Sequence, residues 1–171
     1  MNTAALLAAT ARSFGQARAV SLGERPIWNY AQLHERVARL AGGLRRHPSV
    51  QAGDRIALVM KNCPAYFELM WAGWHAGLCI VPVNAKLHPR EIAFILEHCG
   101  VKLCFVSPDS GIDQVSMGSQ PSALARIISI TMTNTGPCSA TIHCRCSRSM
   151  RPSRPGFSTP AARPAGPRAR R

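Results

Sequence analysis

Short apolar runs alternate with helical patterns over the first hundred residues, and this alternation most restricts what the chain can fold into. The runs at 55–60, 78–83 and 101–106 are almost continuously apolar, which is typical of strands buried on both faces of a parallel sheet. Segments of helical periodicity lie between them, and parallel strands need crossovers of this kind. The sequence therefore predicts an α/β fold: a partial, doubly wound parallel sheet built from βαβ units.

Polar and breaker residues mark where the predicted helices begin and end. Asn29 precedes an amphipathic segment, and Gln32 occupies the position that completes a capping box. A second helix is expected to begin after Asn62, to hold Pro64 in its first turn and to stop before Gly77. The remaining expectations are a helix at 3–13, a strand at 19–22, a helix at 88–99, a weaker helix at 122–126 and a strand at 127–130.

The helix predicted after Asn62 is apolar on nearly all sides. Phe67, Met70, Trp71 and Trp74 share one face, and Leu and Ala residues fill much of the rest. Such a helix is usually buried, and its tryptophans are interpreted as core residues rather than as a ligand platform. If neighbouring elements are incomplete, part of this face stays exposed, so we expect marginal stability and a tendency to associate.

Charge divides the chain into two parts. The net charge is +13, but residues 1–130 carry thirteen Lys or Arg and all eight acids, whereas residues 131–171 carry eight Arg and no Lys, Asp or Glu. The second part also holds six prolines and shows no periodicity of a strand or helix. It cannot bury enough apolar surface to offset its chain entropy. The sequence predicts a partial domain at 1–130 and a disordered basic tail at 131–171.

Cysteine usage and hydropathy indicate a cytoplasmic protein. Seven cysteines is an odd number for a disulfide framework, and four of them stand among apolar residues: Cys63, Cys79, Cys99 and Cys104. These four are interpreted as small core residues in a reducing compartment. No apolar run approaches the length that spans a bilayer, and the N-terminus lacks the basic segment of a secretory signal.

Three segments of the chain, taken in order, resemble one family. They are WNYAQLHERVARLAGGL at 28–44, GDRIALVMKNCP at 53–64 and GLCIVPVNAKLHPRE at 77–91. The AMP-forming acyl-CoA synthetases, relatives of luciferase and of peptide-synthetase adenylation domains, show TYAEL…RVARLAAGL, GDRVALVLPNCPEF and GAVYVPLNPRLTPAEL at matching distances. Each segment alone is a weak signal, but three in the same order are specific. The chain therefore resembles the N-terminal part of such a ligase.

The resemblance implies a reaction of carboxylic or fatty acid metabolism in two steps. A carboxylate attacks ATP to give an acyl-adenylate and pyrophosphate, and the thiol of coenzyme A then displaces AMP. This chemistry needs Mg²⁺, a Ser/Thr/Gly-rich phosphate loop, a Tyr-Gly-x-Thr-Glu segment, an Asp for the ribose and a late Lys. The 171 residues contain none of these motifs. We therefore expect no catalytic, cofactor-binding or metal-binding residue, and a truncated relic that is inactive alone.

A shifted reading frame explains the unusual second part. A hidden codon can be built from the third base of each codon and the first two bases of the next. Pro155 to Arg170 then permits WLFYTSGTTGRPKGA, which is the phosphate-loop signature of the resembled family. The residues from Thr131 onward permit HDEYRALLGDDPLPLQPVDATQPA before it. Third bases are free choices, but the other two are largely fixed, so the match indicates a one-base deletion or two-base insertion near Ile130.

Two alternative functions, from classes other than enzymes, stay open. The chain could be a small α/β module whose basic tail binds nucleic acid or another polyanion, although Phe157 is the tail's single aromatic residue for base stacking. It could also be an interaction fragment that pairs with a full-length synthetase. A metal site at Cys138, His143, Cys144 and Cys146 is disfavoured, because their spacing is not that of a zinc site.

Overall fold

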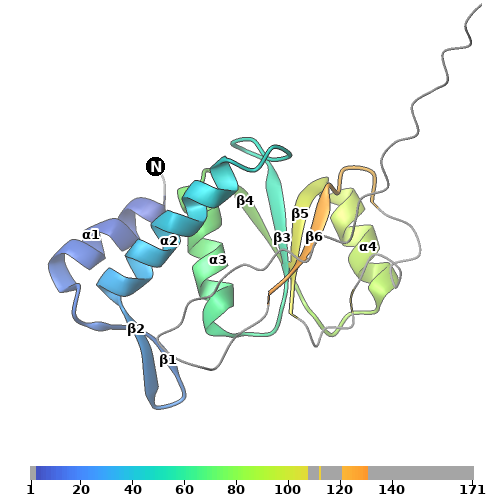
Figure 1. Cartoon of the computed structure of the whole chain (residues 1–171). Coiled ribbons are helices and arrows are strands. Elements are labelled where there is room, and N and C mark those ends of the chain that lie inside the picture. Colours follow the sequence, from blue (N-terminus) through green and yellow to red (C-terminus); the bar gives the residue numbers. More distant parts are fainter. Residues whose placement is uncertain (1–2, 108–111, 113–120, 131–171) are drawn as a thin grey trace, which may run out of the picture.

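The computed structural model describes residues 3–107, 112 and 121–130 (Figure 1). Helix α1 (Ala4–Phe14) is followed by a hairpin of β1 (Arg18–Leu22) and β2 (Arg25–Asn29), and then by α2 (Tyr30–Arg45). The predicted capping box is confirmed at the start of α2. Asn29 accepts a hydrogen bond from the Gln32 backbone N–H at 2.8 Å, and the Gln32 side chain accepts one from the Asn29 N–H at 3.0 Å.

A four-stranded sheet follows, and all of its strand pairs are parallel, as predicted. Its strands appear along the chain in the order β3, β4, β5 and β6, but lie side by side as β4-β3-β5-β6. Helix α3 connects β3 to β4, and α4 carries the chain back past β3 to β5. The bounds are β3 (Arg55–Val59), α3 (Pro64–His75), β4 (Cys79–Val83), α4 (Pro89–His98), β5 (Val101–Val106) and β6 (Arg126–Ser129).

The sheet has a hydrophobic cluster on each face, which explains why its strands are continuously apolar. Side chains of a strand alternate between faces. Ile56 and Leu58 accordingly join the cluster under α1, α2 and α3, whereas Ala57 and Val59 join the cluster under α4. Figure 1 shows α1 to α3 gathered on one side of the sheet and α4 on the other. This is the doubly wound arrangement that the sequence predicts.

Glycine permits the closest contact between a helix and the sheet. Gly73 lies in α3 directly over the strands, and a Cβ atom built there would collide with the Cδ1 atom of Ile80. The Cδ1 atom of Ile56 would lie 3.1 Å away. Just beyond the same, carboxyl-terminal end of the helix, Gly77 has a φ of 81°, a conformation that side chains disfavour, and reverses the chain into β4.

The structure differs from the sequence-based expectation at four places. The N-cap of α3 is Cys63, which makes no side-chain capping bond, rather than Asn62. Strand β2 was not expected, because its five residues are too short to show a clear alternation. In place of the predicted helix at 122–126, residues 122–123 form a turn and Arg126 already belongs to β6. Cys79 is exposed on β4, an edge strand, whereas Cys104 is buried, as expected of a core residue.

Helix α3 is buried on one side, not all round. Its buried residues include Ala65, Glu68, Leu69 and Ala72. The aromatic face looks outward: Phe67 is 48% exposed, and Met70, Trp71 and Trp74 are half-buried. The two tryptophan rings contact each other edge to face, with centroids 5.3 Å apart. The interpretation of this stripe as core is therefore only partly correct.

Two other predictions concern the tail and membrane-spanning segments. The predicted disorder of residues 131–171 lies outside the described residues. In the part of the chain that the structure describes, no helix is both long and apolar enough to cross a membrane.

Candidate functional site

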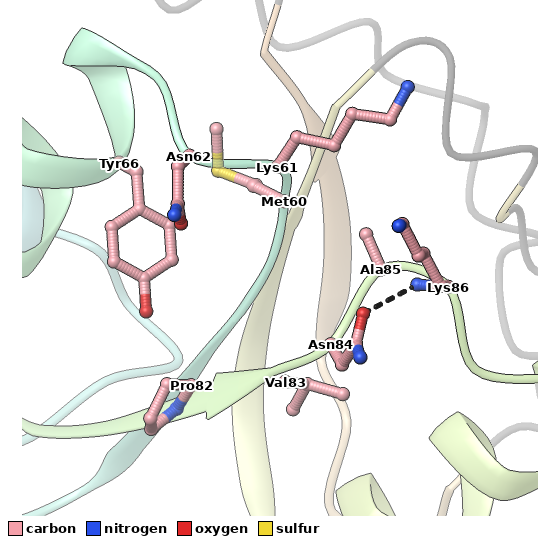
Figure 2. A pocket seen from close by; sticks show the side chains of 9 residues that line it. All are labelled: Met60, Lys61, Asn62, Tyr66, Pro82, Val83, Asn84, Ala85 and Lys86. Carbon is pink, nitrogen blue, oxygen red and sulfur yellow. Dashed lines mark hydrogen bonds between the residues drawn. The ribbon is translucent and has the colours of Figure 1, made fainter.

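The candidate site is a cavity of about 460 Å³ at the carboxyl ends of two neighbouring strands. Crevices at this edge are where open parallel sheets bind ligands. Figure 2 shows residues that follow β3 on one side of the cavity and residues that follow β4 on the other. The lining residues are Met60, Lys61, Asn62, Tyr66, Pro82, Val83, Asn84, Ala85 and Lys86.

The polar groups of this cavity are cationic or neutral. Lys61 and Lys86 are the ionised residues of the lining, and each comes from a loop that leaves a strand. Asn62, Asn84 and the phenol of Tyr66 add hydrogen-bonding groups. Among the described residues that line the cavity, none is acidic. A pocket with this set of groups suits an anionic ligand, such as one that carries phosphates.

Local backbone structure fixes the second loop of the cavity. The Asn84 side chain accepts a hydrogen bond from the Lys86 backbone N–H at 2.9 Å, as Figure 2 shows. Such an Asx turn reverses the chain after β4 and fixes the direction of the next residues. It places Lys86 at the rim of the cavity, and the chain then enters α4 through a capping box formed by His88 and Glu91.

The first turn of α3 forms the opposite side of the cavity. Tyr66 lies in this turn, directly after the loop that leaves β3. The amino end of a helix carries partial positive charge, which adds to that of the two lysines. Pro64 stands at the start of α3, where its missing N–H costs little.

A second polar cluster lies away from the cavity, between α2 and α3. Arg36 donates to the Glu68 carboxylate at 2.9 Å, and both side chains are largely buried. The Arg36 guanidinium also lies 4.5 Å from the centre of the Trp28 ring. Burial raises the pKa of Glu68, and the hydrogen bond from Arg36 opposes part of that rise. The cluster joins β2, α2 and α3, and we interpret it as structural.

The described cysteines and histidines do not form a reactive or metal-binding cluster. Burial raises the pKa of the Cys104 thiol to about 12, so this group is an unreactive core residue. Within residues 3–107, 112 and 121–130, no three His, Cys, Asp or Glu side chains are grouped to hold a metal ion. Cys138, His143, Cys144 and Cys146 lie outside the described residues.

The cavity was not anticipated from the sequence. The sequence predicts no catalytic or cofactor-binding residue, and that prediction stays untested. The sequence places Lys61, Asn84 and Lys86 in segments that resemble a family, but it does not indicate that they line one cavity. A signal was nevertheless present, because polar residues directly follow two predicted parallel strands, 55–60 and 78–83. Which two strands are neighbours depends on the topology.

Comparison with known proteins identifies the family. The model of the AMP-binding enzyme family matches residues 7–153 of the chain. The chain therefore belongs to the AMP-binding enzymes, the adenylate-forming family that its three segments resemble. The matched range extends beyond Ile130, and the boundary between the partial domain and the tail stays a prediction.

The similar proteins include several acyl-CoA ligases. A feruloyl-CoA synthase of an Amycolatopsis species is 39% identical over 99 residues, which are 58% of this chain and 20% of that protein. The crotonobetaine/carnitine–CoA ligase of Proteus mirabilis is 30% identical over 105 residues, or 61% of this chain and 20% of the ligase. The chain thus spans about a fifth of the length of these curated relatives.

Solved structures show the same fold. The fatty acyl CoA synthetase of Mycobacterium tuberculosis superposes with a TM-score of 0.67 at 25% identity, covering 75% of this chain and 26% of that one. The N-terminal domain of FACL13 from the same organism gives a TM-score of 0.69 at 26% identity, covering 75% and 34%. The chain therefore has the fold of part of an acyl-CoA synthetase.

Proposed function

We propose that this chain is the opening portion of an AMP-forming acyl-CoA ligase whose reading frame shifts near Ile130. The observation that carries the proposal is the shifted reading of Pro155 to Arg170, which permits the family's phosphate-loop signature. Its support is that the family match includes residues 7–130, which precede the shift, and that solved acyl-CoA synthetase structures cover 75% of the chain. The family reaction converts a carboxylic or fatty acid, ATP and coenzyme A into acyl-CoA, AMP and pyrophosphate.

We infer that the 171-residue chain does not catalyse this reaction by itself. Adenylation requires groups that stabilise the charge developing on the phosphates, and these are supplied by the phosphate loop and by Mg²⁺ with its ligands. The 171 residues of the chain contain none of the corresponding motifs. ATP, Mg²⁺ and coenzyme A are thus expected to serve the complete ligase rather than this chain.

The nucleotide sequence of the gene tests the frame proposal. We expect that removing the shift near codon 130 opens a frame that encodes the phosphate loop and the remaining ligase motifs. Stop codons throughout that frame would overturn the proposal. For activity, we expect no acyl-dependent exchange of labelled pyrophosphate into ATP above a boiled control. Exchange by the purified chain would show that it adenylates without the loop.

A second proposal concerns the cavity between β3 and β4. We infer that it contacts the phosphate-bearing part of a cosubstrate, ATP or coenzyme A, in the complete ligase. The supporting observation is that Lys61 and Lys86 line the cavity and that none of its other described lining residues is acidic. In the complete ligase, we expect Lys86→Gln to weaken the binding of coenzyme A about tenfold. Calorimetry measures this affinity. Lys102→Gln, a change in β5 outside the cavity, is the matched control. Equal affinities of the two variants for coenzyme A would exclude a role of Lys86 in binding this cosubstrate.

The remaining proposals concern partners and location. The fragment could instead bind a full-length synthetase, or use its basic tail for weak, salt-dependent contact with nucleic acid. A filter-binding titration between about 50 and 200 mM salt separates binding of nucleic acid by the tail from no binding. We propose a cytoplasmic location, since the buried Cys104 and the apolar surroundings of Cys63 and Cys99 suit a reducing compartment.

A further inference from the structure

The outer face of α3 carries a stripe of large apolar side chains: Phe67, Met70, Trp71 and Trp74. They recur at i, i+3, i+4 and i+7, so they share one side of the helix. Phe67 is 48% exposed, and the other three are half-buried. Met70 and Trp71 pack against the hydrophobic cluster below, and the Trp74 ring contacts that of Trp71 edge to face. The stripe is therefore held in place from beneath while part of it faces solvent.

Negative charge is sparse around this stripe. Glu68 is the single acid between residues 55 and 90, and its carboxylate is buried against Arg36. At the carboxyl-terminal end of α3, the exposed Arg45 side chain donates to the His75 carbonyl oxygen at 3.0 Å, which brings a guanidinium to the end of the stripe. Helices α1, α2 and α3 together carry four arginines and two glutamates, so the layer that bears the stripe is positively charged.

The C-terminal residues are a second and larger source of positive charge. Residues 131–171 hold eight arginines and no acid, and four of these arginines lie in the last nine residues. Each Lys or Arg near an anionic membrane strengthens binding several-fold. Peripheral attachment is stable when apolar burial and a polybasic segment act together. This chain carries both signals.

The make-up of the stripe favours a lipid surface over nucleic acid as the partner. Tryptophan rings are amphipathic and are enriched at the boundary between headgroups and acyl chains. Nucleic acid would also attract the arginines through its phosphates. Burying a stripe of four large apolar side chains, however, is favourable only in an apolar phase, which the upper acyl chains of a bilayer supply.

We propose that the outer face of α3, together with the arginine-rich C-terminal residues, binds the surface of an anionic phospholipid membrane. The stripe then lies among headgroups and upper acyl chains, and Arg45 and the C-terminal arginines contact lipid phosphates. The proposal concerns the 171-residue chain itself and does not depend on a shift of the reading frame. Without a membrane, the same stripe is open to contact between copies, and vesicles should reverse that association.

Sedimentation with lipid vesicles tests the proposal on the complete chain. Vesicles of equal parts phosphatidylserine and phosphatidylcholine should bind it at least about tenfold more tightly than vesicles of phosphatidylcholine alone. Phe67→Gln should weaken this binding about tenfold, because it removes a large apolar side chain from the acyl layer. Phe94→Gln, at a residue 68% exposed on α4 and thus on the opposite side of the sheet, is the matched control and should leave binding unchanged.

Two further measurements separate the apolar signal from the basic one. Brominated acyl chains should quench the emission of Trp71 and Trp74, whereas Trp28, which is 5% exposed, should keep its emission. For the basic signal, one combined variant should weaken binding by about tenfold or more and reduce its dependence on salt. Its four substitutions are Arg163→Gln, Arg168→Gln, Arg170→Gln and Arg171→Gln.

Each other outcome overturns the proposal. Equal binding of Phe67→Gln and Phe94→Gln, or emission that brominated lipids do not quench, would exclude contact through α3. Equal affinity for the two kinds of vesicle would exclude recognition of anionic lipid. A single-stranded oligonucleotide that binds more tightly than the vesicles, and that also depends on Phe67, would assign the face to nucleic acid. Dimers that the vesicles do not dissociate would assign the stripe to a second copy.

Discussion

The helices on the two faces of the sheet are held in place by different kinds of polar contact. On the side of α2 and α3, the contacts are a buried ion pair, Arg36–Glu68, and the close approach of Gly73 to the strands. On the side of α4, Glu97 accepts hydrogen bonds from the Ser122 hydroxyl and backbone N–H at an exposed position. Burial decides how much each contact contributes, so the two faces are expected to respond differently to substitution and to acid.

The largest effect is expected from Glu68→Ala. This change removes the carboxylate to which the buried Arg36 guanidinium donates, and breaking a buried pair costs about 3 kcal/mol or more. The exposed pair Arg39–Glu35, whose side chains are 70% and 69% accessible, is the matched control. Glu35→Ala should change the free energy of unfolding by less than about 1 kcal/mol. Urea unfolding followed by tryptophan fluorescence measures both, and equal losses would contradict a structural role for the buried pair.

A smaller loss is expected from Gly73→Val in α3. The new side chain would collide with Ile80 and crowd Ile56, and overpacking of this kind costs about 1–3 kcal/mol. Gly43→Ala in α2 is the control, since no atom lies within 4 Å of the added Cβ. It should raise the unfolding free energy by about 0.5–1 kcal/mol through helix propensity. A neutral Gly73→Val would mean that the helix lies farther from the sheet.

The carboxylates of the two faces should respond to pH in opposite directions. Burial raises the pKa of Glu68 above its ordinary value of 4.5, so the folded state holds this proton more firmly than the unfolded chain. Its contribution to stability is complete below that value and is lost as the pH rises through the raised pKa. Glu68→Gln should therefore flatten the decline of the unfolding free energy above pH 4.5.

On the other face, hydrogen bonds from the Ser122 side chain and backbone lower the pKa of Glu97. Its contribution is present above the ordinary value and is lost as the pH falls through the lowered pKa. Glu97→Gln should therefore reduce the loss of stability in acid. Thermal unfolding of both variants, measured at pH values below and above the ordinary carboxyl pKa, checks the direction in which each group changes stability. The same slope change in both would contradict the contrast between the faces.

The smallest effect on stability is expected from Phe67→Gln. This residue is 48% exposed on the outer face of α3, so the change should alter the unfolding free energy by about 0.5 kcal/mol or less. It should nevertheless reduce association measured by light scattering, because the exposed aromatic stripe favours contact between copies. Phe94→Gln, at a residue 68% exposed on α4, is the matched control. Equal reductions would show that association does not depend on the α3 face.

Local patterns account for what the sequence predicted well. The capping box of Asn29 and Gln32 and the stop at Gly77 depend on residues within one turn of each helix end. The parallel sheet followed from the continuous apolar runs, because each strand faces a hydrophobic cluster on both sides. The short strand β2 and the turn at 122–123 are not predicted from the sequence, because neighbours in space rather than local periodicity fix their conformation.

The sequence by itself determined most of the elements, their order along the chain and the family, since all three depend on residues near one another along the chain. Only the tertiary structure decided which side of α3 is buried, since both sides of that helix are apolar. It also decided that Arg36 meets Glu68 and that Lys61 and Lys86 line one cavity. These contacts depend on which strands are neighbours in the sheet and on how the helices pack. Such long-range contacts join residues from separate segments, and no local pattern encodes them.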